Sequence, residues 1–90
     1  MSVHDGAIEE QVVWVLRERL LVPDNKLDSE HWDKPLTGSF FRLSGVDLAY
    51  LFFELERRFD VRFQESDLVD YGFSTINKIC RAVRRQAGVL

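Results

Sequence analysis

The chain has 90 residues, of which 46% are hydrophobic and 30% charged, and its formal net charge is −3. These values predict one soluble globular domain spanning residues 1–90. The mild negative charge argues against nucleic acid as the main partner, because binding to phosphates requires a basic surface.

The first predicted element is an amphipathic helix over residues 5–21. Its apolar residues recur on one face at helical spacing: Ile8, Val12, Val15, Leu16 and Leu20. Asp5 is suited to cap the start, and the run Val22-Pro23-Asp24-Asn25 stops the helix.

The next segment, up to residue 43, is predicted to be mostly loop. A loop of this length is unusual in so small a domain and is often functional. Five apolar side chains along it predict that it packs over the helices: Leu27, Trp32, Leu36, Phe40 and Phe41.

Residues 45–59 predict the most informative helix, because it is apolar on almost every side. One set of residues follows helical spacing and is expected in the core; we call it the core stripe: Leu48, Leu51, Phe52, Leu55 and Phe59. A second set, the outer stripe, consists of Val46, Tyr50 and Phe53. It must face a partner or a ligand, or else lie buried under the long loop, and both interpretations are open for Phe53. Partner contact is favoured for Tyr50, whose hydroxyl suits a hydrated interface.

Ser44 stands where this helix needs an N-cap, and Asp47, three residues later, completes an approximate capping box. Beyond it, residues 64–70 predict a short helix that ends before Gly72. A last helix, capped by Ser74 and running to about residue 86, places four apolar residues on one face: Ile76, Ile79, Cys80 and Val83. The expected fold is therefore an all-α bundle of four helices.

This order of helices, and residues 43–83 above all, resembles the acyl carrier proteins. The runs Leu36-Thr37-Gly38, Gly45-Val46-Asp47-Leu48 and Tyr50-Leu51-Phe52-Phe53-Glu54 are most similar to acyl-carrier-related proteins of bacterial systems that modify ribosomally made peptides. The resemblance implies an acyl-carrier-like four-helix bundle with a long loop between the first and second helices. It also implies that the second helix docks partner enzymes.

Carriers open the second helix with a serine that bears the phosphopantetheine arm. Aligned without gaps through Leu55 and Phe59, that position falls on Gly45, which has no side chain to modify. The nearby hydroxyl of Ser44 lies one residue early. Two interpretations stay open: Ser44 carries 4'-phosphopantetheine, or it only caps the helix and the protein has no cofactor. Capping is favoured because it explains Ser44 without further assumptions.

Six docking positions are expected on this helix: Val46, Asp47, Tyr50, Phe53, Glu54 and Arg57. The resemblance implies partner contact at the positions of Val46 and Phe53, whereas Arg57 departs from the acidic pattern of the carriers. Three hypotheses follow. The favoured one is an accessory docking module, without the arm, for a biosynthetic or peptide-modifying enzyme. The others are a carrier that delivers an acyl or aminoacyl group from Ser44, and a self-associating helical protein. A monomer or a weak dimer is expected, and none of the three hypotheses makes the protein an enzyme.

Other chemistry has little support in the sequence. Cys80, the single cysteine, excludes an internal disulfide and a thiolate metal cluster, and it is expected in the core. His4 and His31 are scattered, so no metal site is predicted, and no catalytic constellation stands out. The N-terminus lacks the features of a signal peptide and no apolar run is long enough to span a membrane, so a cytoplasmic protein is expected.

Overall fold

The computed structural model describes residues 5–64 and 74–87. Within these ranges the chain forms three α-helices, two short 3-10 helices and no strand. The α-helices are α1 (Asp5–Glu18), α2 (Gly45–Phe59) and α4 (Ile76–Ala87). The all-α prediction is confirmed. Of the short helix predicted over residues 64–70 only Gln64 is described, and its end at Gly72 lies outside the described residues, so the count of four helices stays a prediction.

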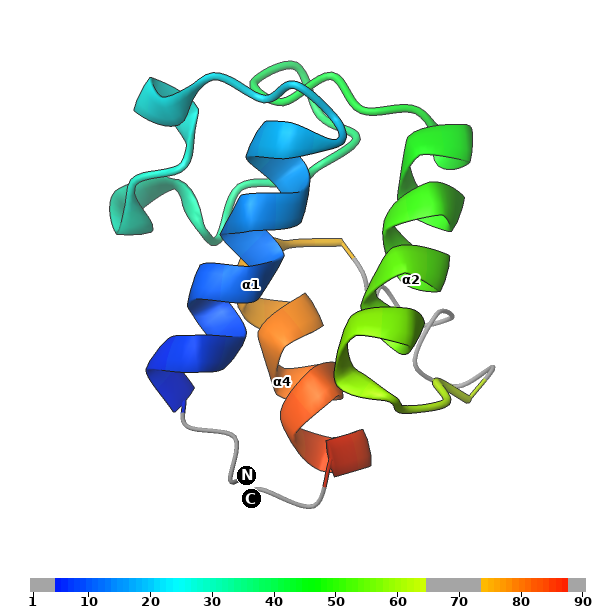
Figure 1. Ribbon diagram of the computed structural model, residues 1–90. Helices are drawn as coiled ribbons and strands as arrows, with labels where there is room; N and C mark the ends of the chain where they lie inside the picture. The colour runs from blue at the N-terminus through cyan, green and yellow to red at the C-terminus, as the bar shows by residue number, and fades with distance from the viewer. Residues whose placement is uncertain (1–4, 65–73, 88–90) are drawn as a thin grey trace.

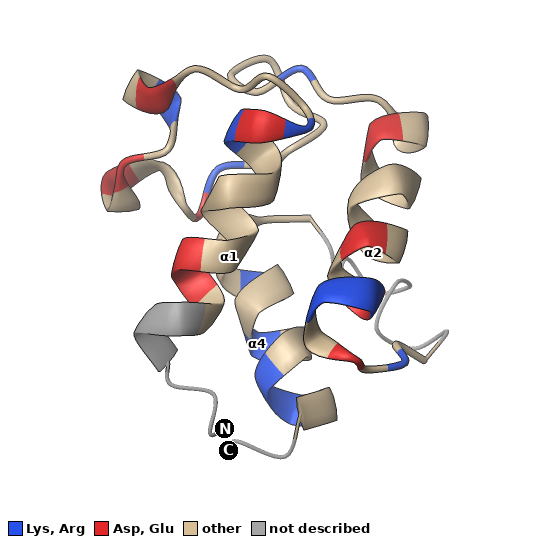
Figure 2. Cartoon of the chain, in the orientation of Figure 1, with Lys and Arg blue, Asp and Glu red and all other residues tan. Residues whose placement is uncertain are grey.

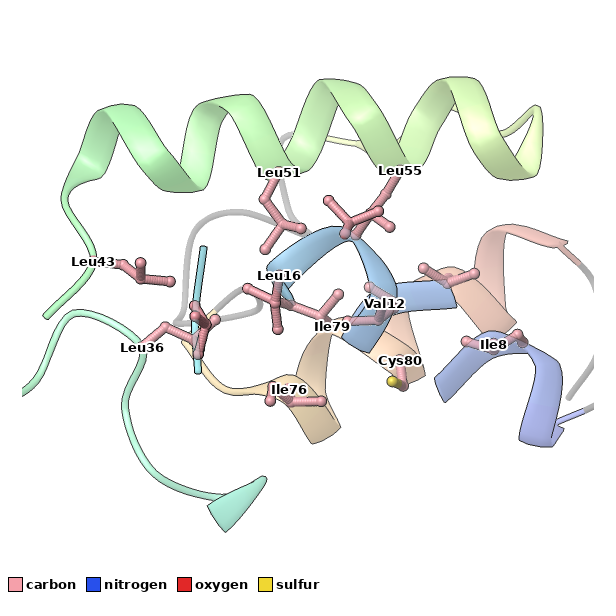
Figure 3. Packing of buried hydrophobic residues seen from close by; sticks show 14 of the residues in the cluster. Ile8, Val12, Leu16, Leu36, Leu43, Leu51, Leu55, Ile76, Ile79 and Cys80 are labelled. Atoms are coloured by element: carbon pink, nitrogen blue, oxygen red, sulfur yellow. The ribbon is translucent and has the colours of Figure 1, made fainter. Parts of the chain in front are cut away.

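The three α-helices share one hydrophobic core. Leu51 and Leu55 of α2 point toward Leu16 and Val12 of α1 and toward Ile79 of α4 (Figure 3). Most of the predicted inner faces of α1 and α4 are confirmed, because these residues are fully buried: Ile8, Val12, Val15, Leu16, Ile76, Ile79, Cys80 and Val83. Leu20 lies beyond the end of α1 and is half-buried against the core. The helical spacing of apolar residues therefore identified the core correctly.

The first helix is shorter than predicted, because α1 ends at Glu18 and not at Leu21. Leu21 adopts a left-handed conformation, with φ 59°, which helix ends favour but leucine rarely adopts. The Val22 N–H donates to the Leu16 carbonyl at 3.0 Å and closes the turn. The chain thus leaves the helical path before the predicted stop signal at Pro23.

The long loop packs on the helices, as predicted. It contains the 3-10 helices η1 (Asp24–Lys26) and η2 (Ser29–His31) and arches over one end of the bundle (Figure 1). Leu27, Leu36 and Phe41 are buried, while Trp32 and Phe40 are half-buried against the core.

Backbone hydrogen bonds fix this loop to the start of α4. The Leu36 N–H donates to the Ser74 carbonyl at 2.8 Å, and the Asn77 N–H donates to the Trp32 carbonyl at 3.1 Å. The predicted cap at Ser74 is one residue off, because the Thr75 hydroxyl accepts from the Lys78 N–H at 3.1 Å. Thr75 directly precedes the first helical residue, which is where a capping side chain must stand.

Candidate functional site

The start of α2 is closed by a complete capping box. The Ser44 Oγ accepts from the Asp47 N–H at 3.1 Å, and the Asp47 Oδ2 accepts from the Ser44 N–H at 2.8 Å. Ser44 itself is in an extended conformation (φ −90°, ψ 170°), as an N-cap should be. The sequence-based prediction of the cap is confirmed, with Asp taking the place that Glu usually fills.

The position next to this cap is open. A Cβ atom built on Gly45 would have no atom within 4 Å. Gly45 is also exposed and forms the first residue of α2. A small side chain would therefore fit here, so position 45 lacks a hydroxyl but not the space for one.

The two stripes of α2 have opposite environments. In the core stripe, Leu51 and Leu55 are fully buried, and its other members pack half-buried against the core: Leu48, Phe52 and Phe59. In the outer stripe the exposed fractions are 80% for Val46, 43% for Tyr50 and 61% for Phe53. The interpretation that buried this stripe under the long loop is wrong, because the loop covers the end of the bundle (Figure 1).

The remaining docking positions differ from one another. Glu54 is only 6% exposed, with its carboxylate 4.0 Å from the Arg58 guanidinium, so it does not extend the exposed surface. The Arg58 guanidinium lies 4.2 Å from the centre of the Trp14 ring and donates to Gln11, joining α2 to α1. Asp47 is half-buried in the capping box. Arg57 is exposed and has no ion-pair partner among the described residues.

A groove beside the end of α2 was not predicted from the sequence. It has a volume of about 770 Å³, and its described lining residues are Phe53, Glu56, Arg57, Asp60, Val61, Arg62 and Gln86. Asp60, Val61 and Arg62 of the turn after α2 form one wall of the groove. The turn begins at Asp60, the helix C-cap, which adopts a left-handed conformation (φ 52°). The Phe63 N–H also donates to Glu56 Oε2 at 2.9 Å and holds the returning chain. Phe53 and Arg57 make this groove continuous with the outer stripe.

Cys80 is a structural residue. Burial, the larger cause, and the nearby negative charge of Glu9 raise its pKa from 9.0 to about 12, against a smaller opposite effect of Arg84. A thiol with so high a pKa stays protonated and unreactive at neutral pH. This agrees with the core position expected from the sequence.

The part of the chain that the structure describes contains no candidate metal site and no helix that could span a membrane. Its His, Cys, Asp and Glu side chains form no group of three or more that could hold a metal ion. None of the described helices has the length and apolar character needed to cross a bilayer. The outer stripe and its groove are therefore the strongest candidate site in these residues.

Comparison with models of known protein families, with curated proteins and with solved structures finds no match to this chain. The function must therefore be argued from the geometry of α2.

Proposed function

We propose that this chain is an acyl-carrier-like accessory module that docks a partner enzyme through the outer stripe of α2, without a phosphopantetheine arm. The observation that carries the proposal is the exposure of Val46, Tyr50 and Phe53 on a helix whose opposite side is buried in the core. Clustered apolar side chains on a surface mark interaction sites, because leaving them in water is unfavourable. The resemblance to acyl carriers suggests the four-helix fold and a partner from bacterial peptide maturation.

The start of α2 supports the absence of the arm. Gly45 has no atom on which a phosphodiester can form, and the Ser44 hydroxyl is engaged with the Asp47 N–H. A hydroxyl that caps a helix must give up this hydrogen bond before a transferase can use it. The interpretation of Ser44 as a carrier site is therefore less favoured than the docking module.

Intact-protein mass spectrometry tests the missing arm. The protein is co-expressed with a phosphopantetheinyl transferase of broad specificity, and we expect its mass to remain unmodified. The matched positive control is the double variant Ser44→Asp, Gly45→Ser, which keeps a capping residue and places a serine where the structure has open space. One added phosphopantetheine on the unaltered chain, lost in Ser44→Ala, would establish the carrier alternative.

Site-specific photo-crosslinking tests docking. A photoreactive phenylalanine analogue is placed at Phe53 and, as a control, at Arg81, an exposed residue of α4. In native cells we expect a discrete crosslinked product with an enzyme from position 53, weakened by Tyr50→Ser, and none from position 81. Equal patterns from both positions would contradict a docking surface on α2.

A further inference from the structure

The exposed side of α2 has a pattern that fits a second copy of itself. Val46, Tyr50, Phe53 and Arg57 succeed one another at intervals of four, three and four positions. This alternation is the spacing at which one helix presents a continuous seam to another helix. The apolar part of the seam is the outer stripe, and it ends in the cation Arg57.

The charges of α2 are arranged with opposite signs at its two ends. Asp47 lies in the first turn and Arg57 and Arg58 lie in the last turn, with Glu54 and Glu56 between them (Figure 2). Two copies of α2 that run antiparallel bring Asp47 of each helix near Arg57 of the other. A parallel arrangement would place like charges together, so the charge pattern selects the antiparallel one.

The groups required for this pairing are available. Arg57 has no ion-pair partner among the described residues, and Asp47 uses Oδ2 for the capping box, which leaves Oδ1 without a partner among them. Gly45 and Ala49 flank Val46 and are both exposed. Their small size leaves room beside Val46 for the Arg57 side chain of an antiparallel copy, while the Phe53 ring then lies opposite Tyr50 of that copy.

We propose that the free protein forms an antiparallel homodimer in which the outer stripes of two α2 helices pack together and Asp47 of each copy pairs with Arg57 of the other. This rests on the proposed function in one respect: the dimer covers the docking face, so a partner enzyme must compete with self-association. Two helices of 15 residues bury less surface than the ~1,200–2,000 Å² of stable specific interfaces. The dimer is therefore weak and forms as the concentration rises.

Analytical ultracentrifugation tests the dimer. Between about 10 µM and about 1 mM we expect the average mass to rise from the 10.5 kDa of one chain toward twice that value. Phe53→Ser should weaken association at least about tenfold, because a two-fold interface loses the ring on both sides. Arg81→Glu, an exposed charge reversal on α4, should leave it unchanged. A constant mass of one chain at all concentrations, or equal behaviour of Phe53→Ser and the unaltered protein, overturns the proposal.

A charge exchange tests the antiparallel register. Arg57→Glu and Asp47→Lys should each dissociate the dimer, since both symmetric ion pairs become repulsive. An equimolar mixture of the two variants should associate again, because both pairs are then attractive. If circular dichroism shows that Asp47→Lys disturbs the helix, Asp47→Asn replaces it, since the amide oxygen can still accept from the Ser44 N–H. Alone it should weaken the dimer, and its mixture with Arg57→Glu should associate more than Arg57→Glu alone, because one of the two ion pairs is restored.

The outcomes separate this dimer from the docking function. If Arg57→Glu and Asp47→Lys are each monomeric alone and their equimolar mixture also stays monomeric, the antiparallel pairing is overturned. Crosslinking from Phe53 to an enzyme in a protein that never dimerises overturns the dimer and leaves the docking function supported. Crosslinking from Phe53 only to a second copy supports the dimer and contradicts the docking function.

Discussion

At the scale of single residues, the Ser44 hydroxyl decides how α2 begins. Its hydrogen bond to the Asp47 N–H satisfies one of the backbone donors that every helix start leaves open. We expect Ser44→Ala to lower the free energy of unfolding by about 1 kcal/mol and Ser44→Asp to change it little, since Asp caps equally well. Urea denaturation measures both values. Equal losses in the two variants would count against the capping role.

Cys80 predicts a loss of stability at alkaline pH. Burial raises the pKa of the folded thiol to about 12, whereas the unfolded thiol keeps a value near 9.0. The stabilising effect of the protonated thiol is therefore fully present below pH 9.0 and is lost as the pH rises toward about 12. We expect the unfolding free energy to fall more steeply between pH 9.0 and about pH 12 in the unaltered protein than in Cys80→Ala. Parallel curves for the two proteins would show that the thiol does not ionise differently on unfolding.

At the scale of elements, α2 has one face for the core and one for the solvent. Leu51→Ser should cost several kcal/mol, because it removes fully buried methyl groups and places a hydroxyl in the core. Phe53→Ser should cost no more than about 1 kcal/mol, mainly through the lost edge contact with the Phe52 ring at 5.2 Å. Thermal and urea unfolding of the two variants measure the difference. Similar losses would mean that Phe53 belongs to the core and would remove the basis for docking at this position.

The bounds of α2 were predictable because local residues set them. Ser44 and Asp47 close the start within four positions, and the predicted range 45–59 is the observed one. The end of α1 was not predictable in this way, because the left-handed Leu21 carries no sequence signal of the kind that glycine gives. The exposure of the outer stripe depends on the path of the distant loop, so the sequence left two interpretations open.

At the scale of the whole molecule, the loop belongs to the same core as the helices. Leu36 precedes α2 in the sequence and is fully buried. Its N–H donates to the carbonyl of Ser74, which follows α2 in the sequence. We expect Leu36→Ala to cost about 2–5 kcal/mol, as for a helix core residue, while the exposed neighbour Thr37→Ala is nearly neutral.

Urea unfolding measures these losses. It also tests whether the loop and the helices unfold together. In a Trp14→Phe background Trp32 is the single tryptophan; it lies in the loop and donates to the Leu27 carbonyl at 2.9 Å, so its fluorescence reports on the loop, whereas circular dichroism reports on the helices. Coincident urea transitions by both probes are expected for one cooperative unit. A fluorescence change at lower urea than the loss of helix would show that the loop opens separately.

The division of α2 into a buried and an exposed side has a consequence for how this protein evolves. Val46, Tyr50 and Phe53 contribute little to the core, so the fold tolerates substitutions there, and these substitutions can alter the preference of the proposed docking surface. Leu51 and Leu55 on the same helix have no such freedom. Diversification should therefore concentrate on positions 46, 50 and 53 of one helix, and in the proposed dimer any single substitution there alters both halves of a symmetric pair at once.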